Sequence, residues 1–170
     1  MWVAVLAVAV GLGGCGDGPV RGGKAKTRPI ELFDTAPAGY RYEAPDAKTR
    51  KEIRGLIGKE APIGGDDIAI RQVVKKGAKQ PVAIAIVIDA RASGKPGDAV
   101  KGFSQQAKEM GSSAERITVA GTEAARARVE GVEAALAGKN GYVVEAVAPD
   151  QPTAKLVLAR LIFAAREAER

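Results

Sequence analysis

Short apolar stretches separated by turn residues predict a series of β-strands along most of the chain. Residues 81–90 read PVAIAIVIDA, so both faces of a strand formed there would be apolar. Such a strand is typical of the centre of a sheet that is covered on both sides. By the same kind of pattern, strands are expected at residues 39–43, 68–74, 81–90, 116–120, 125–129, 132–137 and 142–148.

Turn residues set the pairing expected between these strands. Asn140-Gly141 lies between two apolar runs, and this dipeptide favours a tight hairpin because both residues tolerate positive φ. Further turns are expected at residues 64–67, 75–80 and 121–123. Residues 39–43, which follow Pro37, are expected to form a short edge strand.

Three segments have the spacing of amphipathic helices. Asp46, Asp98 and Asp150 are the expected N-caps, and Pro152 lies in the first turn of the last helix. The positions expected to face the sheet are Ile53, Leu56 and Ile57 in the first helix, Val100, Phe103, Ala107 and Met110 in the second, and Ala154, Val157, Leu158, Leu161, Ile162 and Ala165 in the third.

The predicted order of elements is β-α-β-β-α-β-β-β-β-α. Helices alternate with hairpins here, not with single strands, which favours an α+β fold with a mainly antiparallel sheet packed with about three helices. A doubly wound parallel sheet is the alternative.

An export signal is expected before this domain. Residues 2–12 form an apolar stretch shorter than the roughly 20 residues that span a bilayer as a helix. Residues 12–15 (LGGC) follow it and resemble the lipobox of bacterial lipoproteins. The resemblance implies cleavage between Gly14 and Cys15 and lipid attached to Cys15. The expected organisation is a signal peptide (1–14), a lipidated flexible tether (15–30) and a single α+β domain (31–170).

The segment from Gly121 to Leu161 carries a second resemblance. Its turn glycine, paired strands, Gly141-Tyr142-Val143-Val144-Glu145 and closing helix are similar to small exported actinobacterial domains, and more loosely to the Mog1/PsbP-like sandwich. That likeness again implies an α+β sandwich.

The side chains available for catalysis are few. The 170 residues include no histidine and one cysteine, so the Ser-His-Asp and Cys-His machineries and the usual zinc ligand sets are excluded. Asp66 and Asp67 lack the EF-hand spacing and are interpreted as turn and cap residues. We therefore assign no catalytic residue, metal or cofactor. The alternative is a carboxylate-dependent envelope hydrolase that uses Glu43, Asp46 or Glu60.

The net charge of +6 favours anionic partners. Lys75, Lys76 and Lys79 gather on a predicted loop and form a possible anion-binding site. No aromatic residues interleave with them, so no nucleic acid is expected as a partner. The expected partners are the membrane, through the lipid on Cys15, and an envelope protein or anionic polymer.

Together these features predict a noncatalytic, lipid-anchored protein on the outer face of the bacterial cell membrane, with a ligand- or protein-binding role. A purely structural or electrostatic envelope component is a further alternative. The sequence names neither ligand nor partner.

Overall fold

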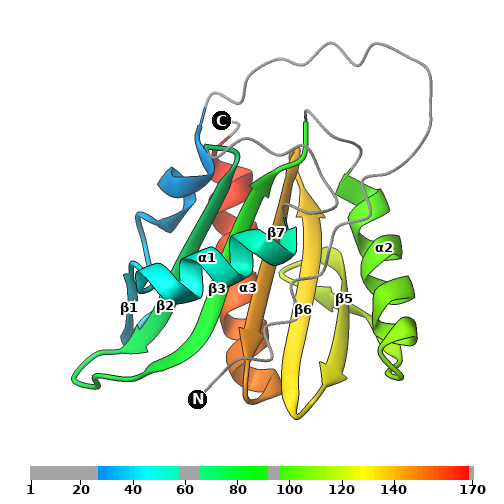
Figure 1. Cartoon of the computed structure of the whole chain (residues 1–170). Helices are drawn as coiled ribbons and strands as arrows, with labels where there is room; N and C mark the ends of the chain where they lie inside the picture. Colours follow the sequence, from blue (N-terminus) through cyan, green and yellow to red (C-terminus); the bar gives the residue numbers. More distant parts are fainter. Residues whose placement is uncertain (1–26, 58–65, 92–95, 169–170) are drawn as a thin grey trace.

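A computed structural model describes residues 27–57, 66–91 and 96–168, which form one sheet with helices on both faces (Figure 1). The strands are β1 (Tyr40–Glu43), β2 (Ile68–Lys75), β3 (Pro81–Asp89), β4 (Ala114–Val119), β5 (Thr122–Val129), β6 (Val132–Lys139) and β7 (Tyr142–Ala148). The helices are the 3-10 helix η1 (Pro29–Phe33), α1 (Ala47–Ile57), α2 (Pro96–Glu109) and α3 (Gln151–Glu167). The predicted α+β class is confirmed.

The seven strands run in the order β1-β2-β3-β7-β6-β5-β4, and every neighbouring pair is antiparallel. The doubly wound parallel alternative is therefore wrong. β3 and β7 lie in the interior of the sheet, as the two-sided apolar pattern of β3 predicts, and β1 is an edge strand. In the middle of the sheet, Ile86 of β3 pairs with Ile70 of β2 on one side and with Glu145 of β7 on the other.

Three hairpins between β4 and β7 turn through two residues with positive φ. These are Ala120-Gly121, Glu130-Gly131 and Asn140-Gly141. A positive φ at both turn residues matches the right-handed twist of the paired strands. The predicted turn at 121–123 is displaced, because Thr122 and Glu123 already belong to β5.

One face of the sheet packs against α1 and α2. Ile53 of α1 and Phe103 of α2 are fully buried in the same apolar layer as Ile86 and Leu136. The expected inward position of Met110 is wrong: its side chain is 46% exposed. Met110 lies beyond the end of α2, and Gly111, with a φ of 73°, turns the chain there.

The opposite face is covered by α3 and η1 (Figure 1). The predicted stripe of α3 is buried as a whole, at Ala154, Val157, Leu158, Leu161, Ile162 and Ala165. Thr27 is tied to this layer, because its carbonyl accepts a hydrogen bond from the Tyr142 hydroxyl and its own hydroxyl donates to Ala168 O. Residues 27–30, which the sequence assigns to a flexible tether, thus include Thr27 and Pro29, which pack on the domain.

Two of the three expected helix caps are observed. Asp46 accepts a hydrogen bond from the Thr49 backbone N–H at 2.8 Å, and Asp150 accepts one from that of Thr153 at 2.8 Å. Asp98 lies inside the first turn of α2, which begins at Pro96. Proline suits this position because its ring presets a helical φ and the missing N–H has no partner inside the helix. The side chains of residues 54–57, including Leu56 and Ile57, lie outside the described part.

Candidate functional site

A pocket of about 480 Å³ lies between α2 and one end of strands β4 to β6. Its lining residues are Val100, Lys101, Arg116, Gly121, Thr122, Glu123, Gly138 and Lys139. Arg116 and Glu123 project to the α2 face of the sheet because alternate residues of a strand point to opposite faces. Gly138 adds no side chain on this face, where a larger residue would fill the space.

The pocket is mainly cationic. Among the described residues that line it, Lys101, Arg116 and Lys139 are cationic and Glu123 is the one acidic residue. Arg116 Nη1 lies 3.0 Å from Glu123 Oε1, so this pair fixes one wall. The two lysines have no carboxylate of the lining set to neutralise them. Such a lining attracts a carboxylate or phosphate group.

Glu145 is a second unusual group, on the same face of the sheet but in its interior. It is 3% exposed in the middle of β7, between Ile86 of β3 and Leu136 of β6. Among the described residues, its Oε1 has no hydrogen-bond partner. Burial raises the pKa of Glu145 to about 8. Glu145 does not line the pocket, so it is not placed to act on a ligand there.

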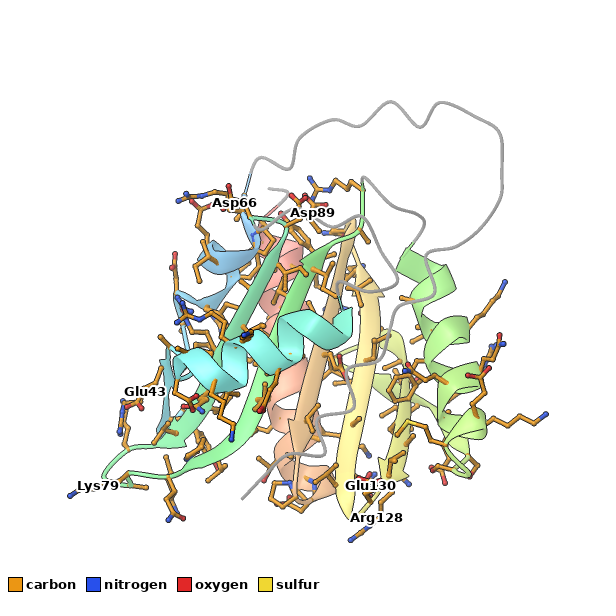
Figure 2. All side chains as sticks on the ribbon, in the orientation of Figure 1. Glu43, Asp66, Lys79, Asp89, Arg128 and Glu130 are labelled. Atoms are coloured by element: carbon orange, nitrogen blue, oxygen red, sulfur yellow. The ribbon has the colours of Figure 1, made fainter. Side chains whose placement is uncertain are left out.

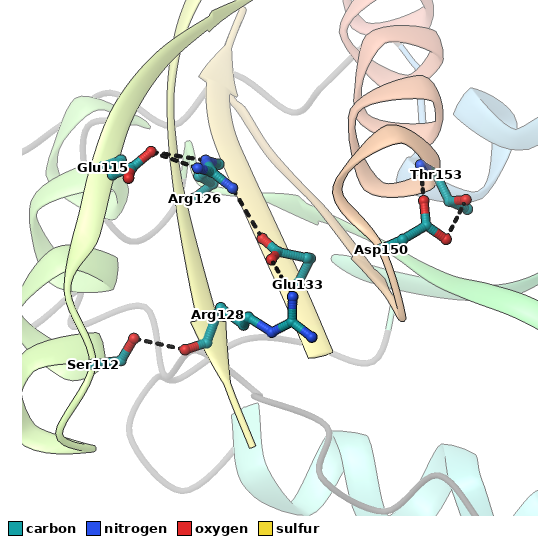
Figure 3. Close-up of polar contacts among 7 residues, drawn as sticks. All are labelled: Ser112, Glu115, Arg126, Arg128, Glu133, Asp150 and Thr153. Atoms are coloured by element: carbon teal, nitrogen blue, oxygen red, sulfur yellow. Dashed lines mark hydrogen bonds and ion pairs between the residues drawn. The ribbon is translucent and has the colours of Figure 1, made fainter. Parts of the chain in front are cut away.

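A charged network occupies the opposite face, across β4, β5 and β6 (Figure 3). Arg126 lies between two carboxylates: Nη2 is 2.7 Å from Glu115 Oε2 and Nη1 is 3.3 Å from Glu133 Oε2. Arg128 Nη1 lies 3.6 Å from Glu133 Oε1. Two arginines and two glutamates balance each other here, so the network carries no net charge.

The lysines predicted to bind anions lie at the other end of the sheet from the pocket. Lys75, Lys76 and Lys79 are exposed at the β2–β3 hairpin, and Figure 2 shows Lys79 at its tip. Arg41 braces this hairpin, with Nη1 on Lys75 O at 3.3 Å and Nη2 on Ala78 O at 3.0 Å. None of the three lysines lines the pocket. The three lysines therefore lie on an exposed hairpin tip and not in a pocket.

The carboxylates considered for hydrolysis have other roles. Glu43 Oε1 lies 2.6 Å from Arg41 Nε, and Asp46 caps α1. The N–H of Thr49 stabilises the ionised carboxyl and lowers the pKa of Asp46, the opposite of what a general acid needs. Glu60 lies outside the described residues. Asp66 is exposed at the start of β2, and the described residues hold no group of three or more acidic, histidine or cysteine side chains suited to a metal.

Cys15, the predicted site of lipidation, also lies outside the described residues, as do Gly14, after which cleavage is predicted, and the turn glycines Gly64 and Gly65. Within the described ranges, no helix combines the length and apolar character needed to cross a membrane.

Sequence reasoning missed the pocket because its cations come from three separate elements, at positions 101, 116 and 139. No local cluster marks them. The sequence did contain a pattern that could have revealed the burial of Glu145. Glu145 is the single charged residue within YVVEAVA, a run that is otherwise apolar on both faces. A strand with that pattern buries every side chain, and its one carboxylate with them.

Comparison with known proteins finds no matching family model, no matching curated protein and no matching solved structure. The likenesses to lipoproteins and to the Mog1/PsbP-like sandwich therefore stay predictions. The function of the protein has to be inferred from its own residues.

Proposed function

We propose that this chain is a noncatalytic, lipid-anchored envelope protein that binds a small anionic molecule in the pocket between α2 and strands β4 to β6. The observation that carries the binding role is the cationic lining of that pocket. Support for the anchor comes from residues 12–15, whose pattern resembles a lipobox.

The dimensions of the pocket suit a small molecule. Ligand pockets commonly enclose about 300–1,000 Å³, and this one has about 480 Å³. Its lysines can reach toward a bound anion as flexible point charges, whereas Arg116 is held by Glu123. We infer a ligand that carries a carboxylate or phosphate group, the chemistry that these cations recognise.

The lining favours binding over catalysis. Its one carboxylate, Glu123, is paired with Arg116, and its one hydroxyl, on Thr122, accepts a hydrogen bond from Arg166 Nη2 at 3.0 Å. General acid–base work needs a group whose proton can be exchanged with substrate. Among the described lining residues, neither the paired carboxylate nor the bonded hydroxyl fits that role.

Titration with inorganic phosphate, followed by ¹⁵N NMR, tests the pocket. We expect the amide signals of Gly121 and Gly138 to shift, and the double variant Lys101→Gln/Lys139→Gln to weaken the apparent affinity about tenfold or more. The matched control is Lys75→Gln/Lys76→Gln, which removes the same charge from the hairpin tip. Equal weakening in both variants would mean that only net charge attracts the anion, as in the electrostatic alternative.

Mass spectrometry of the protein produced in a bacterial host that processes lipoproteins tests the anchor. We expect a chain that begins at Cys15 and carries acyl chains, and a Cys15→Ala variant that is recovered without lipid. A bare Cys15 preceded by residues 1–14 would contradict the anchor and leave the phosphate result unaffected.

A further inference from the structure

The outer side of α3 carries an apolar ridge where a surface helix normally carries polar residues. Leu156 is 43% exposed and Phe163 is 49% exposed. They are seven residues apart, two helical turns, so they lie in line on the side that faces away from the sheet. Pro152 is exposed on the same line, and Glu167 ends it.

Cationic side chains flank this ridge on both sides. At about 100° per residue, Arg160 lies on one side, and Lys155 and Arg166 lie on the other. Arg160 Nε donates to Thr35 O at 2.9 Å. The Arg166 guanidinium lies 5.8 Å from the centre of the Phe163 ring, and its Nη2 donates to Ala120 O and Thr122 Oγ1, so Lys155 and Arg160 are the cations that can turn toward a ligand. Apolar side chains between long cationic ones are typical of helices that lie in a membrane interface, where the cations reach the lipid phosphates.

The position of Thr27 brings the ridge close to the predicted anchor. The Thr27 hydroxyl donates to Ala168 O, directly after the end of α3. A helix rises about 1.5 Å per residue, which places Phe163 about 8 Å and Leu156 about 18 Å along α3 from Ala168. Cys15 precedes Thr27 by twelve residues, and a chain of that length reaches at most about 40 Å. Both side chains are within that reach of a lipid-anchored Cys15.

We propose that α3 is the face by which the domain lies on the membrane, with Leu156 and Phe163 inserted among phospholipids and Lys155 and Arg160 against their phosphates. This inference rests on the proposed lipid anchor. Two apolar side chains bind a bilayer weakly on their own, but an anchor twelve residues away makes the contact intramolecular and raises its effective concentration. The pocket opens on the α2 side of the sheet, so the ligand site would then face away from the membrane.

Tryptophan fluorescence in the lipidated protein tests the orientation. The only tryptophan in the chain is Trp2, which leaves with the signal peptide, so Phe163→Trp provides a single reporter. The matched control is Met110→Trp, because Met110 is exposed to a similar extent, 46%, and lies after α2 on the other side of the sheet. Both variants are reconstituted by their lipid in vesicles of phosphatidylglycerol and brominated phosphatidylcholine.

We expect the brominated lipid to quench the Phe163→Trp emission at least about twofold more than that of Met110→Trp, since an interfacial helix places its apolar side chains at the acyl boundary. Adding Leu156→Gln to Phe163→Trp should reduce the difference. Equal, weak quenching in protein that stays on the vesicles overturns the docking proposal alone. A blue shift without quenching also overturns it, because protein and not lipid then covers the ridge. Protein that washes off with a bare Cys15 overturns the anchor, and docking with it.

Discussion

Two buried glutamates on neighbouring strands, Glu133 of β6 and Glu145 of β7, have opposite surroundings. They are exposed to almost the same small extent, 4% and 3%. Glu133 faces the α3 side, where two arginine side chains approach its carboxylate. Glu145 faces the α1 and α2 side among apolar residues, and its Oε1 lacks a hydrogen-bond partner in the described part of the chain.

The difference shows that depth of burial alone does not decide whether an acidic side chain has a partner. A buried carboxylate stays ionised where cations and hydrogen bonds replace the lost water, and otherwise takes up a proton. Glu133 therefore acts as the centre of a structural network that ties β5 to β6. Burial raises the pKa of Glu145 to about 8, so we expect the stability of the fold to fall as the pH rises from 4.5 toward 8.

The largest effect is expected from Glu145 as the pH rises. The folded state holds this proton more tightly than the unfolded chain, since the pKa of Glu145 rises from 4.5 to about 8. Its stabilising contribution is therefore complete below pH 4.5 and is lost progressively as the pH approaches 8. We expect a loss on the order of 4 kcal/mol in the free energy of unfolding, measured by urea denaturation between pH 4.5 and 9.

Glu145→Gln is the control for that loss. The amide is nearly the same shape and carries no titrating proton, so the variant should lose much less stability over the same pH range. Equal pH dependence in the two proteins would show that Glu145 does not titrate in the folded state and would remove the contrast with Glu133.

A smaller loss of stability is expected from Glu133→Ala. Loss of this carboxylate leaves the Arg126 side chain, 22% exposed, with Glu115 alone. Breaking a buried ion pair from one side is destabilising because the remaining charge loses part of its compensation, here by about 2 kcal/mol. Urea denaturation at pH 7 measures the change. An unchanged midpoint would mean that the network adds nothing to folding.

The smallest effect is expected from Glu115→Gln, at the exposed end of the same network. The side chain of Glu115 is 60% exposed, so water and salt screen its attraction to Arg126. We expect a loss of about 0.5 kcal/mol or less that disappears in 1 M salt. A loss as large as that of Glu133→Ala would show that the strength of these ion pairs does not depend on how exposed they are.

Local chemistry explains which parts of the fold could be predicted. The Asp46 and Asp150 caps, the Asn140-Gly141 turn and the apolar stripe of α3 depend on near neighbours in the chain, and all are observed. The turns at Ala120-Gly121 and Glu130-Gly131 were harder to predict, because alanine and glutamate adopt positive φ there only under the constraint of paired strands.

The candidate site follows the same division. Lys75, Lys76 and Lys79 are close in the sequence, and they remain together on an exposed hairpin tip. The cations of the pocket are separated by up to thirty-eight residues, from Lys101 to Lys139. They meet only because the start of α2 packs beside the end of β6. No spacing rule within one element could have grouped them.

The sequence by itself determined the α+β class, the two-sided burial of β3, and the shortage of catalytic side chains, because these follow from composition and short-range periodicity. Only the tertiary structure decided which acidic residue has a partner. Both Glu133 and Glu145 interrupt apolar strands, but the pleat turns Glu133 toward Arg126 and Arg128 and turns Glu145 toward the other face. Charge compensation depends on distances across strands, and those exist only once the sheet has formed.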